Sequence, residues 1–334
     1  MTRPSLVARR PSVPTPELLA GLVPPPQFAH VSFDSYLADP AEPTQGAAVA
    51  ALRAFAAGPG ATTARRWGRR RTAPPEARPG VYLDGGFGVG KTHLLAALWH
   101  EVPGPKSFGT FVEYTNLIGA LGFNAAVAAF ADRRLICIDE FELDDPGDTV
   151  LMATFLGKLV DRGVRLAATS NTLPDRLGEG RFAAEDFLRE IQGLSAHFEV
   201  LRIEGEDYRH RGRFSSAPVW SQADLEDLAA TSPDSSIDDF DAVLDHLRTI
   251  HPSAYGALVR ELSLVCLRGV HPLSDQADAL RMVVLADRLY DGQVAVAGSG
   301  HSLTEIFPPD MLAGGYRKKY YRTLSRLGAL SVQP

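Results

Sequence analysis

The sequence predicts an α/β fold with a central parallel sheet of five strands flanked by helices, followed by a smaller, mostly helical C-terminal region. This prediction rests on five short apolar runs between Val81 and Ile203, on their spacing and on their composition. The runs read VYLD, GTFVEY, RLICID, VRLAATS and HFEVLRI. Segments of roughly a dozen or more residues separate these runs, as the crossovers of a parallel sheet require. The runs are nearly continuous in apolar residues, which is typical of strands that are covered on both faces.

Proline positions and hydrophobic periodicity divide the chain into three expected parts. Residues 1–26 are predicted to be a flexible leader, because prolines interrupt them repeatedly. Residues 27–215 are predicted to be the core that contains the sheet. Within this core, residues 27–40 are expected to pack as an arm, and an alanine-rich helix is expected over residues 42–58.

Residues 216–334 are predicted to be a helical or mixed region that completes the fold. The expected elements are an acidic helical stretch over 221–262, a strand at LSLVCL (262–267), a helix, turn and strand over 279–300, and a basic helix over 314–330. No internal repeat of the solenoid type is present.

The composition of the 334 residues, with 45% apolar and 22% charged residues, is that of an ordinary globular protein. A net charge of −6 gives no general reason to expect nucleic-acid binding. Cys137 and Cys266 lie in apolar runs without zinc-binding spacing, so we expect buried, reduced thiols. No apolar run approaches the length of a membrane span, and the N-terminus lacks the apolar stretch of a signal peptide. We therefore expect a cytoplasmic protein without an integral membrane segment.

The stretch YLDGGFGVGKTHLL, residues 82–95, matches the phosphate-binding P-loop pattern in full. An apolar strand precedes it and an amphipathic helix follows it, so the expected strand-loop-helix context is present. Glycines let backbone N–H groups approach phosphate oxygens, and the helix N-terminus points its positive dipole end at them. Lys91 is expected to reach the β- and γ-phosphates of ATP, and Thr92 to bind Mg²⁺. The predicted nucleotide-binding residues are Gly85, Gly86, Phe87, Gly88, Val89, Gly90, Lys91, Thr92 and His93. The alternative is a tight turn that only joins a strand to a helix.

A second motif, RRLICIDEFELDD, places two acids at the end of an apolar strand. This strand end is expected to lie near Thr92, where Asp139 holds a magnesium-bound water, as in a Walker B motif. Glu140 is expected to orient or deprotonate the attacking water. The alternative is an ordinary strand that leaves the core through two solvated acids.

A third strand, in VRLAATSNTLPDRL, ends at Asn171. An amide at this position can hold the water or contact the γ-phosphate, the role called sensor 1. The alternative is an asparagine that caps the following helix. Three strand ends then meet at the edge of the sheet where ligands bind in open α/β folds.

The order GVYLDGGFGVGKT, LICIDEFELDDPGD, AATSN, EDYR, DRLYD and RTLSRL resembles the ZapE family, the Afg-type branch of the AAA+-like P-loop ATPases. The more discriminating marks lie outside the ATPase motifs, at Asp207–Tyr208–Arg209, at Leu289–Tyr290–Asp291, and at Arg322 with Ser325–Arg326–Leu327. The chain departs from the family in SFGTFVEYTNLIGALGF, which lacks the usual histidine-rich stretch. Of the double arginine that is usual in the family, it keeps only Arg281. The resemblance therefore does not identify the partner-binding surface.

This resemblance implies a P-loop NTPase of the AAA+/ASCE type that hydrolyses ATP with Mg²⁺ to remodel a partner protein. Bacterial members of the family act in cell division on the tubulin-like division ring, and mitochondrial relatives act in protein quality control. Two alternatives stay open: a helicase-loader or transposition-helper ATPase that acts on DNA, and an ATP-binding quality-control adaptor with little turnover.

AAA+ relatives complete the site with an arginine from a neighbouring subunit, which implies an ATP-dependent homo-oligomer. Arg181 matches this finger best, and Arg189 is the second candidate. Arg281 is a candidate for a sensor-2 contact in cis. The basic run Arg65–Arg71 and the helix YRKKYYR can contact an acidic partner or nucleic acid, but solvated arginines and a protein interface explain them as well.

Overall fold

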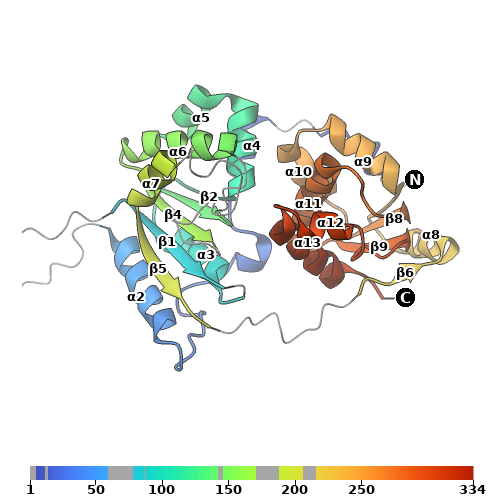
Figure 1. Cartoon of the computed structure of the whole chain (residues 1–334), viewed down its shortest axis with the longest axis horizontal. Coiled ribbons are helices and arrows are strands. Elements are labelled where there is room, and N and C mark those ends of the chain that lie inside the picture. The colour runs from blue at the N-terminus through green and yellow to red at the C-terminus, as the bar shows by residue number, and fades with distance from the viewer. Residues whose placement is uncertain are drawn as a thin grey trace, which may run out of the picture. The chain divides into compact units, whose positions relative to one another are not determined.

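The apolar runs form a five-stranded parallel sheet in the computed structural model of the chain (Figure 1). The structure describes residues 5–11, 14–58, 78–86, 88–141, 146–170, 188–205 and 216–333. The strands are β1 (Gly80–Gly85), β2 (Lys106–Thr110), β3 (Leu135–Asp139), β4 (Arg165–Ser170) and β5 (Phe198–Ile203). Their spatial order, β2-β3-β4-β1-β5, confirms the predicted fold and brings the ends of β1, β3 and β4 together.

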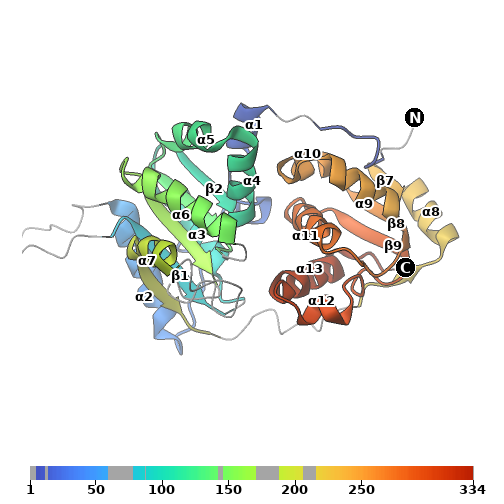
Figure 2. The same cartoon turned by 45° about the horizontal axis from the view of Figure 1, so that its top comes forward.

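Helices cover both faces of this sheet (Figures 1 and 2). On one face, α2 (Pro43–Ala57) and α3 (Lys91–Glu101) bury Leu52 and Leu95 against apolar residues of the strands. On the other face lie α4 (Phe111–Leu121), α5 (Phe123–Phe130), α6 (Pro146–Val160) and α7 (Leu188–Ala196). The helices divide between the two faces because right-handed crossovers join the parallel strands. The chain runs from β1 to the edge strand β2 and then returns across the sheet in the opposite direction, so the later helices lie on the opposite face from α3.

The second strand differs from its prediction. A strand was expected over residues 109–114, but β2 ends at Thr110 and α4 begins at Phe111. The reason is a capping box, in which Thr110 Oγ1 accepts from the Glu113 N–H and the Glu113 carboxylate accepts from the Thr110 N–H. The apolar run therefore belongs to two elements, half strand and half helix.

A second parallel sheet lies in the C-terminal part of the chain, with the order β6-β9-β8-β7. Its strands are β6 (Val219–Trp220), β7 (Ser235–Asp239), β8 (Leu264–Val270) and β9 (Ala295–Gly300). Helices contain about half of the described residues here: α8 (Gln222–Thr231), α9 (Phe240–Thr249), α10 (Tyr255–Val259), α11 (Gln276–Asp291), α12 (Pro309–Ala313) and α13 (Arg317–Leu330). Leu225 of α8 packs on one face of this sheet, whereas α9, α10, α11 and α13 share the core on the other.

The strand β7 interrupts the stretch over 221–262 that was predicted to be helical. Its sequence, SSIDD, has no run of apolar residues that indicates a strand. Ser235, Ser236 and Asp238 are nevertheless buried. The strand is therefore stabilised by contacts with distant parts of the chain, which its local sequence pattern does not indicate.

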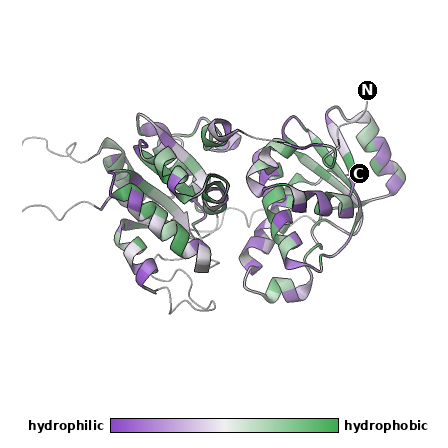
Figure 3. Ribbon diagram, turned by 90° about the horizontal axis from the view of Figure 1, so that it is seen from above, coloured by the Kyte–Doolittle hydropathy of each residue, from purple (hydrophilic) through white to green (hydrophobic). Residues whose placement is uncertain are grey.

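The chain divides into two units, and the N-terminus belongs to the second of them. Residues 19–211 form the P-loop unit, and residues 212–334 together with residues 1–18 form the C-terminal unit. Hydrophobic and hydrophilic segments alternate along the helices of both units (Figure 3), as expected for helices with one buried face. None of the described helices has both the length and the apolar character needed to cross a bilayer.

Residues 5–11, here called the N-terminal strap, differ from the predicted flexible leader because they pack into the C-terminal unit. Leu6 is fully buried in the core of this unit. The Leu6 N–H and the Ser5 hydroxyl donate to the carboxylate of the buried Asp238, at 2.8 and 2.5 Å. These partners lie more than 230 residues away in sequence, so proline positions alone do not reveal them.

Two arginines of the strap make further contacts with the same unit. Arg9 donates to the carbonyl oxygens of Leu258 and Arg260, both at 2.7 Å. The ring of His246 contacts Arg9 and Arg10 of the strap. Its Nε2 lies 2.8 Å from the Arg9 carbonyl oxygen, and its Nδ1 lies 2.7 Å from Arg10 Nη1. Desolvation, with a further contribution from the charge of Arg10, lowers the pKa of His246, although the Arg9 carbonyl and Asp238 act in the opposite direction.

Truncation of Leu6 tests whether the strap stabilises the C-terminal unit. Leu6→Ala leaves a cavity in a packed core, so the opening free energy of this unit should fall by about 2–5 kcal/mol. Native-state hydrogen exchange of the β7 and β8 amides measures that free energy. Leu37→Ala is the matched control because Leu37 is 86% exposed, and it should change little. Equal exchange in Leu6→Ala and wild type would show that the strap adds no stability.

The strap should also loosen at acidic pH. Because folding lowers the pKa of His246, the unfolded chain binds more protons below its ordinary pKa of about 6.5, and stability falls as pH drops through that region. The Leu6 amide should therefore exchange faster at pH 5.5 than at pH 7.5 once intrinsic rates are corrected. His246→Asn should remove this pH dependence, and a wild-type profile in that variant would contradict the assignment to His246.

Candidate nucleotide-binding site

The loop between β1 and α3, which is predicted to bind phosphate, needs glycine at two of its described positions. Gly88 and Gly90 have φ angles of 74° and 85°, in the left-handed region that favours glycine. At Gly90 a side chain would also collide with the ring of Tyr36, 2.6 Å from the position of its Cβ. The helix α3 then begins at Lys91, as predicted, and presents its N-terminus to the loop. Phe87 lies outside the described residues.

Lys91 spans this loop with its side chain. Its Nζ donates to the carbonyl oxygens of Gly85 and Gly86, at 2.8 and 2.5 Å. The ammonium therefore lies next to the loop glycines that are predicted to surround phosphate. This placement brings a positive charge and a helix N-terminus to the same point, and both favour an anionic ligand.

The arm over residues 27–40 packs beside the loop, which confirms its predicted packing. The Tyr36 hydroxyl donates to the Val89 carbonyl at 2.8 Å, and the His93 ring lies edge-on to the Tyr36 ring at 5.7 Å. His93 Nε2 also lies 3.0 Å from Ser35 Oγ. Sequence reasoning did not identify Tyr36 as a residue of the site. The predicted contact of His93 with a nucleotide stays a prediction.

Asp139 lies at the end of β3 and is 7% exposed. Its carboxylate accepts from the Thr92 hydroxyl at 3.0 and 3.2 Å, which confirms that the strand end lies beside the P-loop threonine. The same carboxylate accepts from the Thr169 hydroxyl at 2.5 Å. Three segments far apart in sequence therefore meet at one carboxylate.

The residues around Asp139 fit a magnesium ion. Carboxylate and hydroxyl oxygens are hard ligands of the kind that Mg²⁺ prefers, and neighbouring ligands in its octahedral shell lie about 3 Å apart. Thr92 Oγ1 and Asp139 Oδ2 lie 3.0 Å apart, close enough for both oxygens to face one ion or a water bound to it. No group of three or more potential metal ligands occurs among the described His, Cys, Asp and Glu residues. Mg²⁺ typically binds one or two carboxylates together with phosphates and waters.

Glu140 follows Asp139 and has an unusual backbone conformation. Its φ of 54° is in the left-handed region, and its side chain is partly exposed beside the buried Asp139. The Glu140 N–H donates to Thr169 Oγ1 at 3.0 Å. Sequence reasoning included Thr169 in the strand that leads to Asn171 but gave it no role.

An open groove of about 520 Å³ adjoins the phosphate loop. It shares Gly85 and Gly86 with that loop. Its other lining residues are Glu42, Asp84 and the four residues 202–205, which form the end of β5 and the two positions after it. Its volume lies within the range of small-molecule sites. The groove extends the candidate site from the phosphate loop toward β5.

Several predicted site residues lie outside the described part of the chain. They are Asn171, Arg181, the basic run Arg65–Arg71 and the family mark Asp207–Tyr208–Arg209. The strand before Asn171 is described, and β4 pairs with both β1 and β3. Arg189 is an exposed residue of α7.

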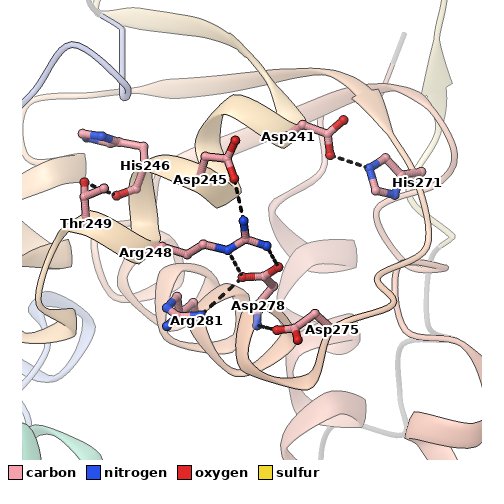
Figure 4. Close-up of polar contacts among 9 residues, drawn as sticks. All are labelled: Asp241, Asp245, His246, Arg248, Thr249, His271, Asp275, Asp278 and Arg281. Atoms are coloured by element: carbon pink, nitrogen blue, oxygen red, sulfur yellow. Dashed lines mark hydrogen bonds and ion pairs between the residues drawn. The ribbon is translucent and has the colours of Figure 1, made fainter.

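Arg281, the sensor-2 candidate, lies in α11 of the C-terminal unit (Figure 4). Its Nη1 is 3.3 Å from the carboxylate of the buried Asp278, which also accepts from Arg248 of α9. The hydrogen bond from Arg248 and its charge lower the pKa of Asp278, against the effect of desolvation. The bond from Arg248 to Asp278 joins α9 to α11, whereas the contact of Arg281 with Asp278 lies within α11, and the sensor role of Arg281 stays a prediction.

The family marks in α11 and α13 lie close together. Arg322 and Arg326 donate to the carboxylate of Asp287, and the Arg326 guanidinium lies 5.1 Å from the centroid of the Tyr290 ring. Desolvation raises the pKa of Asp287, but the charges of the two arginines outweigh it, so this pKa lies below its usual value. Tyr320 of the YRKKYYR helix is 1% exposed and stacks on Phe307. These side chains are engaged inside the unit, which disfavours base stacking by Tyr320 and phosphate contact by the two arginines.

Comparisons with known proteins connect these motifs to one family. The model of the AFG1-like ATPase family matches residues 12–233 and 221–333. The cell division protein ZapE of Escherichia coli K12 is 27% identical over 313 residues, which cover 80% of this chain and 82% of that protein. An uncharacterized protein of Schizosaccharomyces pombe is 26% identical over 153 residues, 40% of this chain and 34% of its own length.

Among solved structures, domain III of the replication initiation protein DnaA of Thermotoga maritima matches with a TM-score of 0.41 and 18% identity. The match covers 55% of this chain and 69% of that one. DnaA of Aquifex aeolicus bound to AMPPCP matches with a TM-score of 0.41 and 10% identity, over 89% of this chain and 90% of that one.

Removal of the Lys91 ammonium should weaken ATP binding. Lys91→Ala deletes a charge-assisted interaction with phosphate, and such interactions correspond to roughly 10- to 100-fold in affinity. Titration calorimetry with a slowly hydrolysed ATP analogue measures the change. Lys158→Ala, at an exposed position of α6, is the matched control and should bind as the wild type does. Unchanged affinity in Lys91→Ala would remove Lys91 from the binding site.

Proposed function

Because this chain belongs to the AFG1-like ATPase family, we propose that it hydrolyses ATP with Mg²⁺ in the site at the ends of β1, β3 and β4. The observation that carries this proposal is the pair of hydrogen bonds from Thr92 of the P-loop to the buried Asp139. A turn that merely joined a strand to a helix would not need a buried carboxylate opposite its threonine. The adjacent Glu140 then supplies a base at the rim of the same site.

Each residue has a separate task in this proposal. Lys91 and the N-terminus of α3 bind the β- and γ-phosphates, and Thr92 with Asp139 holds Mg²⁺, which neutralises phosphate charge when it is bound. Glu140 orients the attacking water or accepts its proton. Asn171, which follows β4 in the sequence, contacts the γ-phosphate or the water. The groove beside Gly85 and Gly86 offers room for the nucleoside part of ATP.

The biological role that we propose is remodelling of a partner protein in cell division. The support is the similarity to the cell division protein ZapE of Escherichia coli together with the family resemblance of the motifs. The proposed client is the tubulin-like protein of the division ring, and the proposed location is the cytoplasm. An acidic net charge of −6 and the internal pairing of Arg322 and Arg326 favour a protein client over DNA.

We further propose that the site is completed between subunits of a homo-oligomer. An arginine supplied in trans stabilises charge on the transferring phosphoryl group in related ATPases. Arg181 is the proposed finger, on the basis of its position after the sensor-1 strand in the sequence.

Neutralisation of Glu140 tests the reaction. Glu140→Gln keeps the size of the side chain but removes the base, so phosphate release should fall by about 100-fold or more while ATP binding persists. A phosphate-release assay at saturating ATP, with and without Mg²⁺, measures the effect. Glu199→Gln is the matched control, because Glu199 is an exposed residue of β5.

The possible outcomes separate the parts of the proposal. Equal rates in Glu140→Gln and wild type would remove Glu140 from the mechanism. A wild-type protein that binds ATP without releasing phosphate would favour the binding adaptor over the enzyme. If Glu140→Gln retains a tubulin-like client from solution only with ATP, the proposed client gains direct support.

A further inference from the structure

Glu140 has a backbone conformation that non-glycine residues rarely adopt. Its φ of 54° places the Cβ close to its own backbone, which costs free energy for any residue except glycine. Such a conformation persists only where the surrounding contacts enforce it, and it occurs preferentially at functional sites. The contacts that enforce it here fix the direction in which the Glu140 Cβ leaves the backbone.

The residues on both sides of Glu140 are fixed in the protein. Asp139 is 7% exposed and accepts from the Thr92 and Thr169 hydroxyls. Phe141 is fully buried, and its ring lies edge-on to the rings of Tyr82, Phe111 and Phe198, with centroids 5.2–6.4 Å apart. Glu140 therefore projects from a backbone that is anchored one residue before it and one residue after it.

Thr169 contacts all three residues of this segment. Its hydroxyl donates to Asp139 Oδ1 and accepts from the Glu140 N–H at 3.0 Å. Its carbonyl oxygen accepts from the Phe141 N–H at 2.7 Å. Thr169 is 1% exposed, so bulk water cannot easily replace its hydroxyl. One side chain thus joins the metal-binding carboxylate to the backbone of the proposed base.

We propose that Thr169 is a positioning residue for ATP hydrolysis, which orients Glu140 through its hydroxyl. This role rests on the proposed function, because it requires Glu140 to act on the attacking water. A hydroxyl is needed at this point, since the group must donate to a carboxylate and accept from an amide at once. Serine can do both, whereas valine has the same shape and can do neither.

The experiment compares Thr169→Val and Thr169→Ser with the wild type. Thr169→Val should lower kcat by roughly 10- to 100-fold, because a small misplacement of a catalytic group has an effect of that size. KM for ATP should change less than kcat, since Lys91, Thr92 and the loop glycines are untouched. Thr169→Ser should restore most of kcat. Thr323→Val is the matched control, since Thr323 is equally buried and donates to the Lys319 carbonyl within its own helix.

A second measurement follows the hydrogen bond itself and does not depend on activity. In Thr169→Val the Glu140 amide loses its acceptor, so its hydrogen exchange should accelerate about tenfold or more. Thr169→Ser and Thr323→Val should keep the wild-type rate at this amide.

Three outcomes would overturn the positioning role. They are an unchanged kcat in Thr169→Val, a failure of Thr169→Ser to restore it, and unchanged exchange at the Glu140 amide. A wild-type protein without ATPase activity would contradict the proposed function instead, and the exchange result would still show whether Thr169 holds Glu140.

Discussion

The candidate site depends on the buried carboxylate of Asp139. This group accepts from Thr92 at the start of α3 and from Thr169 at the end of β4, while its own strand lies between β2 and β4. A buried carboxylate is costly unless hydrogen bonds compensate it, and both hydroxyls supply such hydrogen bonds. The phosphate loop and the segment that carries Glu140, the proposed base, are therefore joined through one group. Without the Asp139 carboxylate, the phosphate loop and the acidic end of β3 would only lie next to each other.

Other buried aspartates play a comparable part in the C-terminal unit, where arginines are their partners. Asp278 is paired with Arg248 and Arg281, and Asp287 with Arg322 and Arg326. These carboxylates face guanidinium charges, which makes them structural ion pairs. At Asp139 the described partners include the hydroxyls of Thr92 and Thr169. Hydroxyl and carboxylate oxygens are ligands that Mg²⁺ prefers, which is why the metal site is expected at Asp139.

The sequence predicted those features that are encoded locally. The P-loop and the acidic strand end are contiguous motifs, and the order of the apolar runs fixed the parallel sheet. The prediction failed at Phe111, where an apolar run continues into a helix that the capping box of Thr110 and Glu113 begins. It also failed at β7, whose polar residues are buried by distant contacts. Thr169 was missed for the same reason, because its role depends on a hydrogen bond across 29 positions of the chain.

The N-terminal strap changes how the two units are connected. Since residues 1–18 belong to the C-terminal unit, the P-loop unit of residues 19–211 is inserted between two segments of one folded body. Leu6 and Asp238 fix the first segment, and the second segment continues directly from the P-loop unit. Both ends of the P-loop unit are thus covalently attached to the same partner. The two units are therefore joined by two chain connections instead of one, and Phe28 to Tyr36, which pack beside the phosphate loop, follow the first of them in the sequence.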